Sequence, residues 1–577
     1  MKREVMACVL AALLAGGCLS VDTETTETPT VVAFDPAPVS PDAEHLVLPQ
    51  VPQPSDLLRD PATGLVSIPV ETQLQVTNGA PVTVQNFGSE TVAELVVSHF
   101  NTLYGFTTSG GTATVALGGE LMVGSVTSET AYVLDVTDLP GAGAVRQAEV
   151  EVVLGAPETT DRGVRTSMTF LPPAGGWAQG RTYAAVITSG VFDVGGEPLR
   201  SSYVFNLLKS TAPLARDGRT VCALPDASAV QLEGLRLGLA PLFDFLDSVG
   251  VDGETVPRGD IAQLWTFTIR PGAIARYDLL NQIFPTPNDL LLTGPASTPF
   301  DCDGDGAADC LEGHLCFPID CGAGFENASN TFFAYMNSLD GWPAGLLPSV
   351  SFTRAIDPGT VTGDNIQVHD LLAGTPVAGT SWSWDEGTRA LTIQPGTVAP
   401  GGRYAVVVGR GILNADGIYS VAPDDTMGIL KLTHSLVDEA GGSRIAELGL
   451  AGGDAAAEDA LAGLLEVLRT QVDALLKAVD QDGARQDVAA IWSYGIHTGN
   501  EALFDPIGGV IPFPNDLLMT LDAQGNPDHV AIPVPADPVM GPVVEAMNTL
   551  DGFSPLTPTR ARFLRPLDPG NFRPLDT

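Results

Sequence analysis

The sequence predicts a mainly β fold built from tandem β-sandwich modules, each with an associated helical segment. Short β-rich runs bounded by glycine and proline predict the strands, and apolar residues at helical spacing predict the helical segments. Markers that recur along the chain predict the tandem arrangement. The 63 glycines and 45 prolines among 577 residues favour many turns between short strands. A hydrophobic content of 44% is sufficient for several packed cores, and this length favours roughly three or four domains.

Two markers recur three times and define the modules. The first has the pattern Pro-x-Pro-(Ser/Asn)-Asp-Leu-Leu and occurs at residues 52–58, 285–291 and 512–518. The second has the pattern Asn-(Thr/Ser)-Leu-x-Gly followed by an aromatic residue and occurs at residues 101–106, 337–342 and 548–553. Because such repeats mark repeated structural units, we expect module 1 at residues 31–270, module 2 at residues 271–499 and a truncated module 3 at residues 500–577.

Within a module, strands and a helix are predicted from residue type and periodicity. Ala390–Gln394 and Tyr404–Val408 are β-rich runs, and strands at this spacing favour a sandwich. Residues 456–479 carry an apolar stripe at helical spacing, and residues 229–249 are their counterpart in module 1. The stripe consists of Leu461, Leu464, Leu465, Leu468, Val472, Leu475, Leu476 and Val479. We expect these faces to pack against the sandwich rather than against a membrane or a partner helix.

A set of motifs resembles known families of bacterial surface proteins. Residues 400–404 (Pro-Gly-Gly-Arg-Tyr), followed by residues 411–417, resemble the bacterial Ig-like domains of the S-layer type. Both markers, together with residues 232–236 (Leu-Glu-Gly-Leu-Arg) and 260–268 (Asp-Ile-Ala-x-x-Trp-x-Phe-Thr), resemble the N-terminal region of bacterial virulence factor lipases. This resemblance covers nearly all of residues 31–577. It implies a surface lipoprotein in which an α/β-hydrolase domain follows this region, but here the unit recurs and no hydrolase domain follows.

The N-terminus predicts an exported lipoprotein. Lys2 and Arg3 precede a short apolar stretch that ends in Ala15-Gly16-Gly17-Cys18, which resembles a bacterial lipobox with alanine where leucine is usual. We therefore expect a signal peptide at residues 1–17, a lipid on Cys18 and a flexible tether at residues 18–30. The alternative is an ordinary secretory signal with an incidental cysteine. No aspartate follows Cys18, so we expect an outer-membrane lipoprotein that is surface-exposed or faces the periplasm.

An acidic segment in module 2 predicts a structural calcium site. Oxygen ligands fall at loop positions 1, 3, 5, 7, 9 and 12, as in the twelve-residue calcium loop. The expected ligands are Asp301, Asp303, Asp305, the backbone carbonyl of Ala307, Asp309 and Glu312. The alternative is an acidic turn without a metal. Module 2 is longer than modules 1 and 3 at this point, so the calcium loop is expected within an insertion at residues 301–321.

Four cysteines in the same insertion predict disulfides. Cys302, Cys310, Cys316 and Cys321 lie close together in a chain that is expected to be exported. They are expected to form two disulfide bonds, and the sequence does not choose among the three connectivities that four cysteines allow. Cys222 is then either free or paired elsewhere.

Composition and motifs argue against catalysis and against nucleic-acid binding. A net charge of −41 repels phosphate backbones. The chain contains no G-x-S-x-G nucleophile elbow, and its histidines form no metal-binding pattern. Residues 258–260 spell Arg-Gly-Asp, but the module 2 counterpart at residues 485–487 is Arg-Gln-Asp, so we interpret this segment as a helix start.

Two functional hypotheses follow. The leading hypothesis is a non-catalytic cell-surface lipoprotein whose Ig-like repeats display or bind an extracellular ligand or protein that the sequence does not identify. The rival is the N-terminal portion of a surface lipase or lysophospholipase whose hydrolase domain lies beyond Thr577. Because module 3 stops just after a shared Leu-Asp-Pro motif at residues 567–569, we expect a truncated chain rather than a natural end inside a sandwich.

Overall fold

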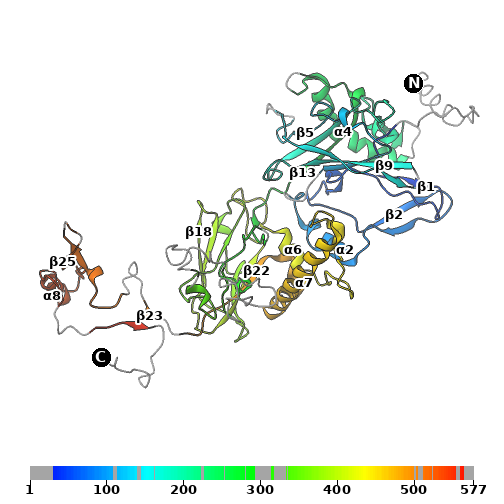
Figure 1. Ribbon diagram of the computed structural model, residues 1–577. Coiled ribbons are helices and arrows are strands. Elements are labelled where there is room, and N and C mark those ends of the chain that lie inside the picture. Colours follow the sequence, from blue (N-terminus) through cyan, green and yellow to red (C-terminus); the bar gives the residue numbers. More distant parts are fainter. Residues whose placement is uncertain are drawn as a thin grey trace, which may run out of the picture. The chain divides into compact units, whose positions relative to one another are not determined.

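The chain forms a mixed α/β fold with many small, mostly antiparallel sheets, in which strand residues somewhat exceed helical residues (Figure 1). The computed structural model describes residues 30–107, 113–139, 145–160, 163–221, 226–251, 254–279, 281–292, 314–317, 333, 335–499, 502–503, 511–522, 524, 526–553 and 559–563. Contacts divide the chain into two units. Unit 1 comprises Met1–Asn288, Leu347–Thr397 and Arg403–Tyr494, and unit 2 comprises Asp289–Leu346, Val398–Gly402 and Gly495–Thr577.

The first repeat in unit 1 contains two main sheets. The larger sheet has the order β13-β10-β5-β6, from β5 (Ala131–Asp135), β6 (Arg146–Gln147), β10 (Thr182–Thr188) and β13 (Ile261–Thr268). The other has the order β4-β9-β7 with β8 beside β9, from β4 (Ala113–Leu117), β7 (Glu151–Leu154), β8 (Glu158–Thr160) and β9 (Gly163–Leu171). Side chains alternate along β10, so Ala185 and Ile187 share a core with Phe170 of β9, whereas Ala184 and Val186 belong to a second core.

The second core lies between the larger sheet and two helices. Ser202 caps α3 (Tyr203–Leu208) by accepting a hydrogen bond from the backbone N–H of Phe205. Phe205 packs with Phe243 of the long helix α4 (Asp226–Ser248) and with the buried Leu134 of β5. The larger sheet is therefore buried on both faces, by a second sheet on one side and by helices on the other.

The rest of the first repeat is made of short elements. These are β1 (Val39–Ser40), η1 (Asp56–Leu58), β2 (Glu71–Val76), β3 (Val82–Gln85), α2 (Glu90–Ser98), η2 (Phe100–Thr102), η3 (Val123–Ser125), β11 (Ala215–Arg216), β12 (Arg219–Thr220) and η4 (Arg258–Asp260). Ser89 caps α2 through the N–H of Thr91. The Arg-Gly-Asp segment was expected to start a helix, but it forms only the three-residue turn η4 and leads directly into β13, which contains the tryptophan.

The second repeat has the same strand order. One sheet is β17-β16-β20-β22, from β16 (Ile366–Asp370), β17 (Thr375–Pro376), β20 (Arg403–Gly409) and β22 (Val488–Gly495). The other is β15-β19-β18, from β15 (Ser349–Ser351), β18 (Ser381–Asp385) and β19 (Ala390–Gln394). A short parallel pair, β14 (Ile274–Ala275) and β21 (Ala422–Pro423), links the start of this repeat to the segment that precedes its short helix. Strands β19 and β20 confirm the two runs predicted from the sequence.

Helices of the second repeat match α3 and α4 in order. They are α6 (Asp425–Leu430) and α7 (Ala455–Ala478), with the turns η7 (Pro358–Thr360), η8 (Ala446–Leu448) and η9 (Asp482–Asp487). Helix α7 confirms the helix predicted at residues 456–479, and Leu465, Leu468, Val472 and Leu476 of its stripe are buried. Leu464 belongs to the predicted stripe, but its side chain is exposed, so the buried stripe is narrower than expected.

Unit 2 carries smaller elements in its described part. They are η5 (Asp289–Leu291), β23 (Ala502–Leu503), η10 (Asp516–Leu518), β24 (Met519–Leu521), β25 (Pro527–Val530), α8 (Met540–Met547) and β26 (Arg562–Phe563). Strand β24 pairs with β25, and β23 pairs with β26, both antiparallel. None of the helices in the described residues is long and apolar enough to cross a membrane.

Candidate functional site

Most of the predicted site residues lie outside the described residues. They are Cys18 of the predicted lipid anchor, the predicted calcium ligands Asp301, Asp303, Asp305, Ala307, Asp309 and Glu312, and the cysteines Cys222, Cys302, Cys310 and Cys321. Cys316 is described and is disulfide-bonded. The pairing scheme therefore stays a prediction. Within the described ranges, no group of three or more His, Cys, Asp or Glu side chains could hold a metal ion.

Two described residues on either side of the predicted calcium loop, residues 301–312, are joined by a backbone hydrogen bond. The N–H of Cys316 donates to the carbonyl of Leu291 at 2.7 Å. The same bond closes the shorter segments of the other repeats, where Ser67 donates to Leu58 and Ala531 donates to Leu518, each at 2.7 Å. Leu291 and Cys316 therefore close the second repeat with the same backbone bond that the other two repeats use.

The aspartate of the first marker anchors the last strand of a repeat. The carboxylate of Asp56 accepts hydrogen bonds from the N–H of Thr268 at 2.9 Å and from its hydroxyl at 3.1 Å. In unit 2, Asp289 accepts one from the N–H of Gly495, also at 2.9 Å. The proline before the Ser or Asn of this marker follows a cis peptide bond in all three repeats. This marker therefore ties the start of a repeat to its last strand.

The side-chain amide of the asparagine in the second marker both accepts a hydrogen bond from the backbone of one residue and donates a hydrogen bond to it. The Oδ1 atom of Asn101 accepts from the N–H of Ile68 at 2.8 Å, and its Nδ2 donates to the carbonyl of Ile68 at 2.9 Å. Asn337 binds Phe317 in this way, and Asn548 binds Ile532. Two hydrogen bonds to one backbone unit require a side-chain amide, which explains why asparagine recurs.

The glycine of the second marker lies against the last strand. A Cβ atom on Gly105 would lie 2.6 Å from the carbonyl oxygen of Thr268, and one on Gly341 would lie 2.7 Å from the backbone nitrogen of His497. Backbone contact at this distance excludes any side chain. The glycine and the asparagine of this marker therefore both serve packing.

The Leu-Glu-x-Leu-Arg motif also has a structural role in both repeats. Arg236 donates to Glu233 at 2.9 and 2.8 Å, and Arg469 donates to Glu466 at 2.8 and 2.7 Å. Glu233 also accepts from the backbone N–H of Leu214, as Glu466 does from that of its counterpart. The hydrogen bond from Arg236 lowers the pKa of Glu233. These pairs attach the loop after the short helix to the long helix.

Arg258 of the Arg-Gly-Asp segment is engaged within the protein. Its guanidinium forms an ion pair with Asp244 of α4 and donates a hydrogen bond to the backbone carbonyl of Lys209. Arg485, its counterpart in the second repeat, pairs with Asp473 and donates to the carbonyl of Lys431. The arginine is therefore part of the shared scaffold rather than a free recognition element.

A group of titratable side chains lies where the two repeats meet inside unit 1. We name it the junction cluster: His99, Arg270 and Lys431, which are buried, and Arg410 and Asp425, which are partly buried. The Nε2 atom of His99 lies 2.9 Å from Oδ1 of Asp425, and Nη1 of Arg270 lies 3.1 Å from the same oxygen. A Cβ atom on Gly428 of α6 would lie 2.5 Å from Cγ of His99, so the imidazole packs directly on the backbone of that helix.

Burial controls the protonation of the junction cluster. Desolvation lowers the pKa of His99 although the hydrogen bond with Asp425 acts in the opposite direction. Burial alone would raise the pKa of Asp425, but the charge of Arg270 and the hydrogen bond with His99 outweigh it, and the pKa is lowered. Burial lowers the pKa of Lys431 to about 7. The cluster thus joins a neutral imidazole, a carboxylate and a guanidinium at neutral pH.

Further contacts attach the α2–η2 segment to the second repeat. Glu94 accepts hydrogen bonds from the backbone N–H groups of Thr433 and His434 at 2.8 and 3.0 Å. The hydroxyl of Thr91 donates to the carbonyl of Ser435 at 2.9 Å, and Arg410 donates to the carbonyl of Thr102 at 2.7 Å (α2, α6 and α7 in Figure 1). Helix α2 of the first repeat therefore docks on α6 and the loop that follows it.

No sequence motif points to the junction cluster. In the other repeats, tyrosine (Tyr335) and alanine (Ala546) stand at the position of His99, and Tyr203 stands at that of Asp425. The cluster is therefore not part of the repeated pattern, and its members lie far apart in the chain. With every cation paired to a carboxylate or to backbone carbonyls, the arrangement suits a fixed joint rather than a reacting centre.

Comparisons with known proteins add no assignment to this geometry. No protein-family model matches the chain, and no curated protein sequence matches it. The functional argument therefore rests on the residues and contacts described above.

Proposed function

We propose that this chain is a non-catalytic lipoprotein of the cell envelope, anchored through Cys18, whose repeats have a display, binding or structural role outside the membrane. The observation that carries the proposal is that the polar residues shared by the repeats make contacts within the protein. Asp56, Asn101, Glu233, Arg236 and Arg258 all have hydrogen bonds or ion pairs that hold a repeat together. An enzyme needs polar groups that converge on a substrate, whereas these groups converge on backbone and on one another.

We further propose that each repeat is an Ig-like sandwich with an added helical layer. The first repeat supports this proposal because β9 of one sheet and β10 of the other contribute Phe170, Ala185 and Ile187 to one core. The strand order β17-β16-β20-β22 in the second repeat is the counterpart of β6-β5-β10-β13 in the first. Two rigid modules joined by a packed interface would act as a spacer that holds a binding surface away from the membrane.

Calcium is proposed as a structural cofactor of the second repeat. The support is the position of the predicted loop, residues 301–312, between Leu291 and Cys316, which are joined by the backbone bond that also closes the shorter segments of the other repeats. An excursion at such a point leaves the core unchanged. The carboxylates expected at residues 301–312 are hard oxygen ligands of the kind that calcium prefers.

A second candidate function is the N-terminal region of a surface lipase. It is favoured by the motif set, because the two markers, the Leu-Glu-x-Leu-Arg helix and the tryptophan strand form one connected scaffold in the first repeat. Asp56 and Asn101 act within this scaffold, and Trp265 donates to the carbonyl of Pro54 at 3.1 Å. A protein of the virulence factor lipase type with these motifs would share the scaffold and carry its catalytic groups in another domain.

The test combines localisation with activity. Cells that produce the full chain or its Cys18→Ser variant are treated with a membrane-impermeant amine label and then fractionated. We expect labelled wild-type protein in the outer membrane and the variant in soluble fractions, because only the thiol can take the lipid. Purified residues 19–577 should not hydrolyse p-nitrophenyl esters above a heat-denatured control. Membrane partitioning of the serine variant would overturn the anchor, and ester turnover would overturn the non-catalytic assignment.

A further inference from the structure

Two neighbouring turns of the first repeat bring four exposed apolar side chains together. The backbone N–H of Met122 donates to the carbonyl of Phe192 at 2.9 Å, and the hydroxyl of Ser125 accepts from the N–H of Phe192 at 2.9 Å. Met122 is 43% exposed, Val123 73%, Phe192 38% and Val194 61%. We name these four residues the apolar tip. Single exposed apolar residues are ordinary, whereas a group of them indicates a contact surface.

The charged residue within these turns points inward. Asp193 stands between Phe192 and Val194 but is only 8% exposed, because side chains alternate along an extended backbone. Its carboxylate accepts a hydrogen bond from the N–H of Glu197 at 2.9 Å. Residues 121–128 and 190–196 contain no other charged side chain. The exposed surface of these segments is therefore uncharged, as a surface that enters lipid must be, because an unpaired charge is costly in an apolar medium.

The predicted tether joins the first repeat beside the apolar tip. Oγ1 of Thr30, the last residue of this tether, donates to Oδ2 of Asp193 at 3.3 Å, and the carbonyl of Thr30 accepts from the N–H of Arg200 at 3.1 Å. Thr30 itself is buried. It is 12 residues from Cys18, and a chain spans at most about 3.6 Å per residue, so Thr30 can lie no more than about 40 Å from Cys18.

The second repeat builds the same turns without the apolar tip. The N–H of Asp357 donates to the carbonyl of Leu413 at 2.9 Å, as Met122 does to Phe192. The residues at the four tip positions are then Asp357, Pro358, Leu413 and Ala415, and Leu413 is partly buried. Ile418 is the one large apolar side chain of these turns that is exposed, and it stands alone. The fold of the turns therefore does not require an apolar surface.

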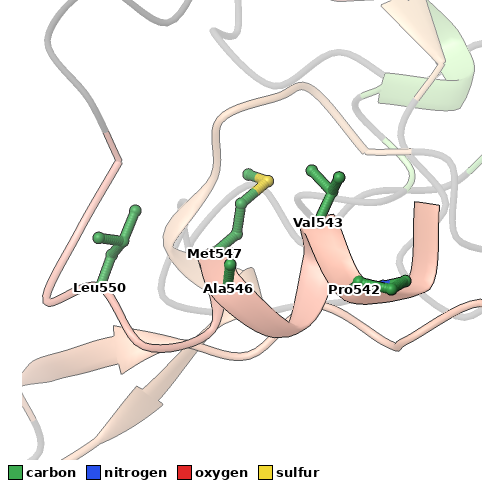
Figure 2. A pocket seen from close by; sticks show the side chains of 5 residues that line it. All are labelled: Pro542, Val543, Ala546, Met547 and Leu550. Carbon is green, nitrogen blue, oxygen red and sulfur yellow. The ribbon is translucent and has the colours of Figure 1, made fainter. Parts of the chain in front are cut away.

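Apolar side chains also gather at helix α8 in unit 2. They line a pocket of about 430 Å³ and come from Pro542, Val543, Ala546, Met547 and Leu550 (Figure 2). The apolar tip differs from this pocket because Asp193, between two of its members, is bonded to Thr30 at the end of the tether. That bond indicates which partner the tip meets.

We propose that the apolar tip inserts into the surface of the bilayer that holds the lipid of Cys18, so that the first repeat rests on this membrane. The inference rests on the proposed anchor. A short tether keeps the tip at a high local concentration near the bilayer, so a contact too weak to recruit a free protein is sufficient. Large apolar side chains are buried at the boundary between headgroups and acyl chains.

The surroundings of the tip favour uncharged lipid. Glu120 and Glu197 are exposed and flank the two turns, and the whole chain has a net charge of −41. Like charges repel, so an anionic bilayer would oppose the contact. The expected partner is therefore the surface of a bilayer of uncharged phospholipid, and the test uses phosphatidylcholine.

The test places a fluorescent reporter in the tip. Residues 19–577 with an N-terminal histidine tag are bound to phosphatidylcholine vesicles that contain a nickel-chelating lipid. The tether is then attached whether or not Cys18 takes a lipid in the cell. Val123→Trp supplies the reporter, and Pro358→Trp, at the equivalent position of the second repeat, is the matched control. Emission is compared between ordinary vesicles and vesicles with brominated acyl chains, which quench tryptophan that reaches them.

Two further measurements complete the design. The emission of the parent chain is subtracted to remove the contribution of its own tryptophans, and circular dichroism verifies that each variant folds. A third variant adds Met122→Asp/Val194→Ala to Val123→Trp. It gives the tip the residues of the second repeat, where the same turn is stable, so it should fold.

We expect the emission of Val123→Trp to shift to the blue on the vesicles and to be quenched by bromine, and that of Pro358→Trp to do neither. Met122→Asp/Val194→Ala should abolish the quenching while the protein stays on the vesicles. Absence of quenching in Val123→Trp, equal quenching of both reporters, or quenching that survives the double substitution would overturn the inference. A blue shift without vesicles would assign the tip to a second copy of the chain instead. Fractionation of Cys18→Ser tests the anchor separately, so the two failures are distinguishable.

Discussion

The Nε2 atom of His99 lies 2.9 Å from Oδ1 of Asp425, although the two residues are 326 positions apart in the chain. This contact joins the helix before the second marker of one repeat to the short helix of the next. Arg270, at the end of the last strand of the first repeat, binds the same carboxylate at 3.1 Å. One oxygen of Asp425 thus receives groups from two different segments of the first repeat, which fixes the junction.

Replacing His99 should change how stability depends on pH. Burial lowers the pKa of His99 below its usual 6.5, so on acidification the unfolded chain takes up this proton before the folded chain does. The contribution of His99 to the free energy of unfolding is fully present above about pH 6.5. It is lost as pH falls, by at most about 1.4 kcal/mol per pH unit. We expect His99→Gln to flatten the slope between pH 5 and 7. The measurement is urea unfolding across that range, with exposed His45→Gln as control; parallel curves for all three proteins would contradict it.

Removing the carboxylate of Asp425 should destabilise the junction. Asp425→Asn leaves Arg270, which is buried, without its anionic partner. Breaking such a pair from one side typically costs about 3 kcal/mol. Chemical denaturation of the full chain should show this loss, whereas Glu439→Gln at an exposed loop should behave as wild type. If both variants unfold at the wild-type midpoint, the pair does not stabilise the junction.

The size relationship between His99 and Gly428 can be tested within one chain. Gly428→Asn should clash with the imidazole, and His99→Ala should leave a gap beside α6. The double variant pairs a small residue on the α2 side with a larger one on α6 and should recover about 1–2 kcal/mol relative to the sum of the single effects. A double-mutant cycle of unfolding free energies measures this coupling. Strictly additive effects would show that the two positions do not complement each other.

The asparagine of the second marker should be more sensitive than an ordinary surface residue. Asn101→Ala removes both hydrogen bonds to Ile68. The backbone N–H and carbonyl of Ile68 then lack these partners, which costs about 1–3 kcal/mol. Asn101→Asp keeps the acceptor and loses the donor, so its effect should be smaller. Thermal unfolding of the three proteins gives the order. Equal melting temperatures for wild type and the alanine variant would refute the two-way clamp.

Calcium should bind the insertion of the second repeat. Five carboxylates at residues 301–312 repel one another without a cation, and extracellular sites of this type bind in the range of ~0.1–1 mM. Calorimetric titration should give heat for wild type and little for Asp301→Ala/Glu312→Gln. The matched control is Asp364→Asn, a carboxylate in an exposed turn. Equal heats in wild type and the double variant would end the idea.

Local patterns determined much of the scaffold. The β-rich run at residues 390–394 is β19, and the helix predicted at residues 456–479 is α7 within a residue at each end. These elements were predictable because strand and helix periodicity depend on neighbours in the chain. The markers predicted that units repeat, and their asparagine binds the backbone within its own repeat, as Asn101 binds Ile68.

The sequence by itself therefore determined where repeats begin, which runs form strands, and that a long helix accompanies each full repeat. The tertiary structure alone decided which faces meet. His99 and Asp425 contact each other because α2 docks on the next repeat. A local sequence pattern carries no information about a contact between segments so far apart in the chain. Side-chain contacts between remote segments depend on how whole elements pack, so the burial of Val96 follows from the neighbours that its repeat has in space.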